Sequence, residues 1–171
     1  MNPETPGAAL LVGLLTALRQ ELKQYGEMLA RLDQQQEYVI VRAAEDVLRS
    51  AGSIQEQMET IQAARQEREQ RQAEVVTFLK LEGDPTFARL IPILPAPYRV
   101  AIASLVREIN DLLARVQHRA RQNHLLLHRS LEMMQQFLSV LLPVAPPKTY
   151  NGGGQLQPLD QPVQALYQAV G

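Results

Sequence analysis

The hydrophobic positions of the chain repeat at the spacing of long amphipathic helices. From Leu11 they advance in steps of four and three, which places the side chains on one helix face. This first stripe consists of Leu11, Leu15, Leu18, Leu22, Tyr25, Leu29, Leu32, Gln36, Val39 and Ala43. A second stripe follows as Val47, Ala51, Ile54, Met58 and Ile61 and fades toward Val75 and Leu79. Since strand-like alternation is absent, the pattern predicts an all-α fold.

The phase of the stripe slips after Ala43, where consecutive steps of four locally unwind a supercoil. The segment Ser50-Ala51-Gly52-Ser53 follows, and glycine costs about 1 kcal/mol in a helix interior. These features predict helices over 5–50 and 53–81 with a break at 50–53. One unbroken rod over 5–81 is the alternative, because no proline lies between Pro6 and Pro85.

Prolines divide the rest of the chain. They predict a short helix over 85–91, a stiff connector containing Pro92 and Pro95, and a long helix over 97–142 that Pro143 closes. The last helix carries its own stripe of Ile102, Leu105, Ile109, Leu112, Val116, Ala120, Asn123, Leu127, Leu131, Met134, Leu138 and Leu141. We expect a helical domain over 1–142, built as an antiparallel bundle or helical hairpin with coiled-coil packing. Residues 143–171 are rich in proline and glycine and predict a flexible tail.

Composition excludes several classes of function. Lys and Arg total 17 and Asp and Glu 18, a balance that argues against a dedicated nucleic-acid binder. The absence of cysteine excludes disulfides, thiolate zinc sites and a cysteine nucleophile. No stretch reaches the roughly 18 unbroken apolar residues of a membrane span, so we expect no membrane insertion. The apolar run 8–15 lacks a basic region before it, and it is interpreted as the start of a helix in a cytoplasmic protein.

Few residues are candidates for a chemical role. His124, His128 and Glu132 share one helix face, but no His-Glu-x-x-His or Glu-x-x-His pattern accompanies them. We interpret them as a solvated polar stripe. The glycines at 152–154 follow a helix and precede no Gly-Lys-Ser/Thr, so they are not a phosphate loop. We therefore expect no enzyme activity, no metal site and no cofactor.

A basic stripe on the last helix has two interpretations. It contains Arg115, Arg119, Arg121 and Arg129 and no acidic residue between 113 and 131. The favoured interpretation is that it docks onto the acid-rich middle of the chain, which contains Asp33, Glu37, Glu45, Asp46, Glu56 and Glu59. The alternative is a phosphate, nucleic-acid or acidic-partner surface, for which binding would depend steeply on salt.

The end of the last helix carries more apolar residues than one face requires. Leucine, methionine and phenylalanine side chains between 125 and 142 occupy more than one stripe, whereas a helix of a small bundle needs an apolar face about 100° wide. The excess fits a wider core or a homodimer. It fits equally a groove for the amphipathic helix of a partner, with methionine as the adaptable element.

Several elements, in this order, resemble the FlgN-type flagellar export chaperones. They are the heptad helix from Leu11 to Leu32, a charged Gln/Arg-rich segment around 65–71, and Asn123-His124-Leu125-Leu126 followed by Leu131 and Leu138. After the proline break comes Thr149-Tyr150-Asn151-Gly152-Gly153-Gly154-Gln155, which is similar to the family's Tyr-x-x-x-Gly element. The resemblance covers about residues 8–155 and leaves the 92–97 connector and the 156–171 extension unmatched.

The resemblance implies a bacterial cytoplasmic chaperone of type III export. Such proteins keep the hook-filament junction proteins soluble by gripping their terminal helix, and they deliver them to the cytoplasmic domain of the export gate. The implied gate contact is Tyr150. The implied substrate surface is Leu126, Leu131, Met134, Phe137, Leu138 and Leu141. The alternative function is a homodimeric coiled-coil scaffold or tether, whereas a chaperone would be a monomer or a weak homo-oligomer.

Overall fold

The computed structural model describes residues 6–81, 86–141, 148–150 and 156–158. Its helices are α1 (Pro6–Ile40), α2 (Ala44–Phe78), the short α3 (Phe87–Leu90) and α4 (Ala96–Leu141). A 3-10 turn at Ile91–Ile93 follows α3, and two short strands follow α4, β1 (Lys148–Tyr150) and β2 (Leu156–Pro158). The chain divides into two compact units, Met1–Leu127 and His128–Gly171, which are described separately.

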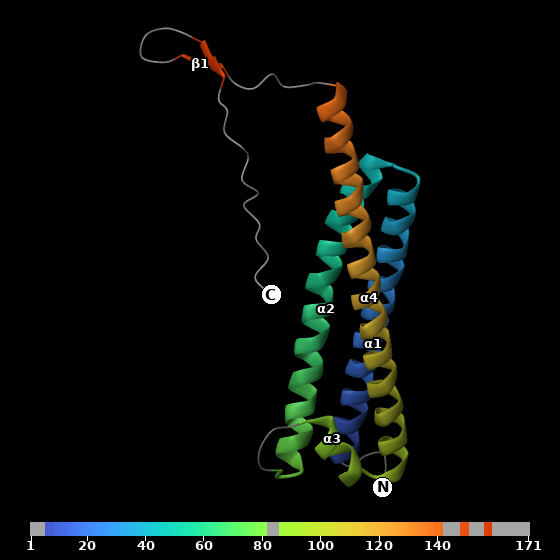
Figure 1. Cartoon of the computed structure of the whole chain (residues 1–171). Helices are drawn as coiled ribbons and strands as arrows, with labels where there is room; N and C mark the ends of the chain where they lie inside the picture. Colours follow the sequence, from blue (N-terminus) through green and yellow to red (C-terminus); the bar gives the residue numbers. More distant parts are fainter. Residues whose placement is uncertain (1–5, 82–85, 142–147, 151–155, 159–171) are drawn as a thin grey trace. The chain divides into compact units, whose positions relative to one another are not determined.

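The first unit is a bundle of three long helices, which confirms the predicted all-α fold (Figure 1). Helix α2 runs antiparallel to α1, since Gln57 bonds to Gln24 whereas Arg68, farther along α2, pairs with the earlier Glu21. Helix α4 runs parallel to α1, and Asn123 donates to the Leu32 carbonyl. Helix α1 therefore packs against both other long helices.

Aliphatic side chains from every helix of the first unit form its core. The most deeply buried are Leu14, Leu18, Val75, Leu90, Leu94 and Ile102. Burying each leucine contributes about 1.5–3 kcal/mol relative to exposing it. Helix α1 buries more than its predicted stripe, because Leu14 and Met28 are buried beside Leu11, Leu18 and Tyr25. Contact with two neighbouring helices requires this wider face.

The break between the first two helices lies at 41–43, not at the predicted 50–53, and the alternative of one unbroken rod is wrong. Arg42 adopts a left-handed conformation with φ of 59°. Its N–H donates to the Val39 carbonyl at 3.2 Å, and the Ala43 N–H donates to the Tyr38 carbonyl at 3.0 Å. These two bonds are the Schellman motif that ends a helix.

The sequence conceals this break because the left-handed position is usually glycine, and here it is arginine. Helix α2 ends in the same way, before the predicted residue 81. Lys80 has φ of 51°, and the Leu81 N–H donates to the Val76 carbonyl at 3.2 Å. Gly52, which suggested the break at 50–53, lies inside α2. Only the phase slip after Ala43 marked the true position.

The buried face of α2 differs from its predicted apolar stripe. Its buried residues are Ser50, Gln57, Ala64, Gln72 and Val75. Ala51 and Met58 of the predicted stripe are exposed, and Ile54 and Ile61 are half-buried. Over its first half, α2 thus turns polar and small residues toward α1 and leaves its apolar stripe to one side.

The connector between α2 and α4 closes one end of the bundle (Figure 1). Helix α3 spans Phe87–Leu90 rather than 85–91, and residue 85 lies outside the described residues. Leu90 and Leu94 are almost fully buried. The Arg99 guanidinium donates twice to the Leu94 carbonyl, at 3.2 and 2.9 Å, and fixes the start of α4.

The second unit contains the last turns of α4 and a hairpin. Helix α4 ends at Leu141, close to the predicted 142, and every residue from His128 to Leu141 is exposed. The strands pair antiparallel, with Lys148 opposite Pro158 and Tyr150 opposite Leu156. The sequence analysis did not predict this pairing. The other residues of 143–171 lie outside the described part of the chain, so the flexible tail stays a prediction.

The position of the break predicts the effect of substitutions at residues 42 and 52. Nothing lies within 4 Å of a Cβ built on Gly52. Gly52→Ala should therefore raise the free energy of unfolding by about 0.5–1 kcal/mol. Arg42→Gly should raise it by up to about 1 kcal/mol, because it removes left-handed strain. Urea unfolding measures both effects, with Ala51→Gly as the control, which should lower stability. A loss of stability in Gly52→Ala would contradict a helical Gly52 and favour a break at 50–53.

Candidate functional site

The last turns of α4 expose an apolar surface. At the spacing of an α-helix, the apolar side chains there cover about half of the helix circumference. We define the terminal face as two neighbouring stripes. The first stripe contains Leu131, Met134, Leu138 and Leu141, and the second contains Met133, Phe137 and Val140. The opposite side carries the polar residues Glu132, Gln135, Gln136 and Ser139. An apolar patch of this continuity marks an interaction site in a folded protein.

The predicted substrate residues do not share one environment. Leu131, Met134, Phe137, Leu138 and Leu141 are exposed, by fractions between 48% and 62%. Leu126 is half-buried and belongs to the first unit. It is related by helical spacing to Met133 and Val140 rather than to Leu131. Met133 and Val140 are not among the predicted substrate residues, although both belong to the apolar excess between 125 and 142.

A second apolar surface lies in the first unit, where α2 and α4 flank α1. We call it the α2–α4 groove; its volume is about 600 Å³. Tyr25, Met28 and Leu32 contribute from α1. The apolar residues of the flanking helices are Ile54, Met58, Ile61, Leu113, Val116 and Ala120. The apolar stripe of α2 alone does not predict this groove. The feature of the sequence that could have predicted it is a second face of α2 with heptad spacing, made of the polar and small residues Ser50, Gln57 and Ala64.

A buried polar network fixes α2 against α1 next to the groove. The Arg68 Nε donates to Glu21 Oε2 at 3.0 Å, and the exposed fractions of the two side chains are 15% and 4%. The Gln57 amide donates to the Gln24 side-chain oxygen at 2.9 Å and to the Gln24 carbonyl at 3.0 Å. The Arg68 guanidinium also lies 5.9 Å from the centre of the Phe87 ring. A buried carboxylate needs such partners, because burial without them costs several kcal/mol.

Tyr25 stands between this network and the groove. Burial raises the pKa of its phenol above the usual value, and the neighbouring Glu21 carboxylate raises the pKa further. The charges of Arg65 and Arg68 oppose this shift but do not cancel it. The phenol is therefore a neutral donor beside a carboxylate over the physiological pH range.

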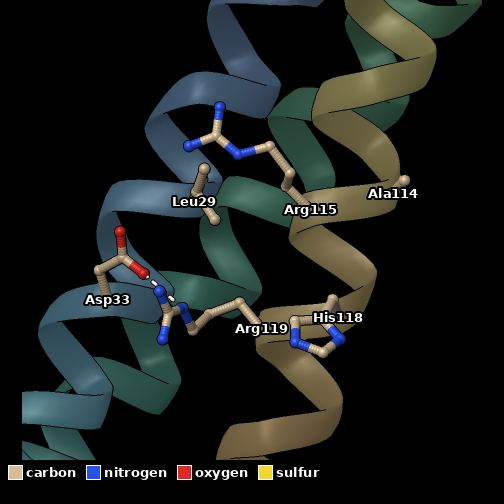
Figure 2. A pocket seen from close by; sticks show the side chains of 6 residues that line it. All are labelled: Leu29, Asp33, Ala114, Arg115, His118 and Arg119. Atoms are coloured by element: carbon tan, nitrogen blue, oxygen red, sulfur yellow. Dashed lines mark ion pairs between the residues drawn. The ribbon is translucent and has the colours of Figure 1, made fainter.

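Among the described residues, the basic stripe of α4 forms an ion pair with α1 at Arg119. Arg119 Nε lies 2.6 Å from Asp33 Oδ1 (Figure 2). The same guanidinium donates to Gln36 and to Gln122. This pair confirms, at Arg119, the predicted docking onto the acid-rich middle of the chain. Arg115 lines a pocket of about 340 Å³ beside Leu29 and Asp33. In the described residues Arg115 and Arg121 make no ion pair.

Asn123 holds the same two helices in register. Its amide nitrogen donates to the Leu32 carbonyl at 2.7 Å and to the Gln35 side-chain oxygen at 3.2 Å, and only 2% of the residue is exposed. A polar residue at a seam position fixes the axial alignment of helices, because a shifted alignment would leave it without partners. Asn123 therefore positions α4 along α1.

The remaining candidate residues lie on α4 and β1. His128 Nδ1 lies 3.8 Å from Glu132 Oε1. Within the described residues, no three His, Asp or Glu side chains are placed to hold a metal ion. Tyr150 lies in β1, opposite Leu156. Over the ranges that the structure describes, no helix has the length and apolar character needed to cross a membrane.

Fold and site together define a helical binding protein that presents exposed apolar helix surfaces. A family model described as FlgN protein matches residues 11–158, so the chain belongs to the FlgN family. FlgN proteins are flagellar export chaperones, a family of binding proteins rather than of enzymes, and they bind substrates of type III export. No curated protein matches the chain, and no solved structure matches it.

The raised pKa of Tyr25 predicts an alkaline loss of stability. A raised pKa means that the folded state holds the phenol proton more tightly than the unfolded chain does. The stabilisation is complete below the unfolded pKa of about 10 and is lost as the pH rises through the folded value. Between about pH 9 and pH 11, the wild type should therefore lose more unfolding free energy than Tyr25→Phe.

Urea unfolding at the two pH values measures this difference, with Tyr38→Phe as the matched control on α1. Equal losses in the wild type and Tyr25→Phe would contradict the assigned cause.

Proposed function

We propose that this chain binds hook-filament junction proteins through the terminal face of α4 and keeps their terminal amphipathic helix from assembling before export. The observation that carries the proposal is the width of the exposed face, which covers half of the helix over Leu131–Leu141. Membership of the FlgN family supports the kind of client. Type III export in bacteria implies that the protein acts in the cytoplasm.

The energetics of such binding need no catalytic group. Each leucine-sized side chain that the client covers contributes about 1.5–3 kcal/mol, from which the ordering of the client helix is subtracted. Met133 and Met134 add unbranched, polarizable side chains that adapt to more than one partner surface. The terminal face therefore suits a set of related client helices.

Delivery to the export gate is the second part of the proposal. The resemblance of residues 149–155 to the family's Tyr-x-x-x-Gly element supports Tyr150 as the gate contact. An amphipathic tyrosine ring is well suited to fill a pocket on a partner, because one end is apolar and the other forms hydrogen bonds. The client surface and the gate contact then belong to different segments, α4 and β1.

Truncation of the terminal face should weaken client binding without unfolding the bundle. Phe137→Ala and Leu141→Ala should each raise the dissociation constant for a client terminal-helix peptide about tenfold, the equivalent of 1.4 kcal/mol. Helix content by circular dichroism should stay near the wild-type value, because both side chains are exposed. Val100→Ala, which truncates an exposed valine at the start of the same helix, is the control. Normal binding in both variants would locate the client surface elsewhere, and unfolding of both would make these residues core.

Substitution of Tyr150 should separate delivery from client binding. Tyr150→Ala should leave client affinity unchanged, weaken binding to the isolated cytoplasmic domain of the gate and lower the rate of client secretion. Thr149→Ala, at the neighbouring position of β1, is the control. Secretion at the wild-type rate in Tyr150→Ala would exclude the docking role and favour a scaffold, which does not need this tyrosine.

A further inference from the structure

The chain carries two apolar surfaces of opposite form, the α2–α4 groove and the terminal face of α4. The groove is concave and open, and Met58 in its wall is 53% exposed. The terminal face is convex and also exposed. A helix in a groove between two other helices touches both, so it needs an apolar face wider than one stripe. The terminal face has that width.

The two surfaces are also alike in having little charge that is not already paired. Of the described residues that line the groove, two are charged, and both have partners: Arg65 lies 4.0 Å from Glu21, and Glu69 pairs with Arg68 at 3.2 Å. The other polar lining consists of the amides Gln62, Gln66 and Gln117. The sequence from Met133 to Leu141 likewise contains no charge, and its polar residues are Gln135, Gln136 and Ser139. Neither surface therefore presents an unpaired charge for the other to bury.

The dimensions agree as well. The span from Leu131 to Leu141 is about 15 Å long at 1.5 Å per residue. The groove lining on α2 runs from Ile54 to Glu69, about 22 Å, so a helix segment of that span fits within it. A groove volume of about 600 Å³ suits the few anchor side chains with which one helix binds another. A helix of this length and composition fits better than a flat protein surface.

A terminal face that fills the α2–α4 groove must come from another molecule. Helix α4 is unbroken from Ala96 to Leu141, and Leu113, Val116 and Ala120 of the same helix line the groove. A segment of an unbroken helix cannot lie beside an earlier segment of that helix. The terminal face can therefore enter only the groove of a second copy.

We propose that the terminal face of one molecule docks into the α2–α4 groove of a second copy. The contact is head-to-tail, because it joins two different surfaces, and each added molecule leaves one groove and one face open. Association then grows with concentration instead of stopping at a symmetric dimer. If the terminal face also binds the client, a step that rests on the proposed function, self-association covers this face until a client displaces it.

Sedimentation equilibrium of the purified full chain, without any client, tests the contact. The wild-type weight-average mass should rise with concentration between about 10 μM and 1 mM, past the mass of a dimer. Met58→Glu places a carboxylate in the groove, and Leu138→Glu places one on the terminal face. Each alone should raise the dissociation constant at least about tenfold and leave a monomer, because the new charge would be buried without a partner. Leu48→Glu and Val100→Glu, at exposed positions outside both surfaces, should associate like the wild type.

A mixture of Met58→Glu and Leu138→Glu tests whether the contact is head-to-tail. Met58→Glu retains its terminal face and Leu138→Glu retains its groove, so the mixture should form a one-to-one dimer that grows no further. Circular dichroism checks that both variants remain folded. A wild type that stays monomeric up to about 1 mM would overturn the proposal. So would a mixture that stays monomeric, or a Met58→Glu variant that associates like the wild type through paired terminal faces.

Client binding by Met58→Glu keeps the two proposals separate. This variant should bind the client peptide at least as tightly as the wild type, because the groove no longer competes for the terminal face. Loss of client binding in this variant would place the client in the groove and overturn the terminal face as the client surface. The mass measurements need no client and remain a test of self-association in either case.

Discussion

The polar pairing of α2 with α1 is the constraint on which the rest of the structure depends. Glu21 and Gln24 are buried on α1, and they receive Arg68 and Gln57 from α2. A buried carboxylate without its guanidinium would cost several kcal/mol, so this contact decides which face of α2 turns inward. Ile54 and Met58 consequently line an open groove instead of the core, whereas Ile61 lines the groove and also packs against the core. An open apolar groove thus arises from an electrostatic requirement of the bundle.

Helix α4 has two different surroundings along its length. Up to Leu127 it belongs to the bundle, where Arg119 pairs with Asp33 and Asn123 bonds to the Leu32 carbonyl. These contacts fix its rotation and its position along α1. From His128 to Leu141 every residue is exposed, and the apolar side chains there stabilise no core. Their exposure has a cost in solubility, which the proposed binding of a client through the same side chains would offset.

Two residues in the left-handed backbone conformation end helices of the bundle, and neither is a glycine. Arg42 and Lys80 end α1 and α2 through the same pair of backbone hydrogen bonds. Each pays a small steric cost, about 1–2 kcal/mol, that the packing of the helices on either side offsets. Where tertiary contacts decide the end of a helix, glycine and proline are not needed to mark it.

The sequence by itself determined the helical class, the long last helix, the excess of apolar residues at its end and the family resemblance that the comparison confirmed. These features follow from local periodicity and from motifs, which need no knowledge of neighbouring helices. Tertiary structure alone decided the break at Arg42, the buried polar face of α2 and the groove beside it. A heptad stripe shows that one face of a helix is apolar, but the rotation of that face depends on buried charges far apart in the sequence. Glu21 and Arg68 meet only when α2 folds back on α1, and that meeting sets the rotation of α2.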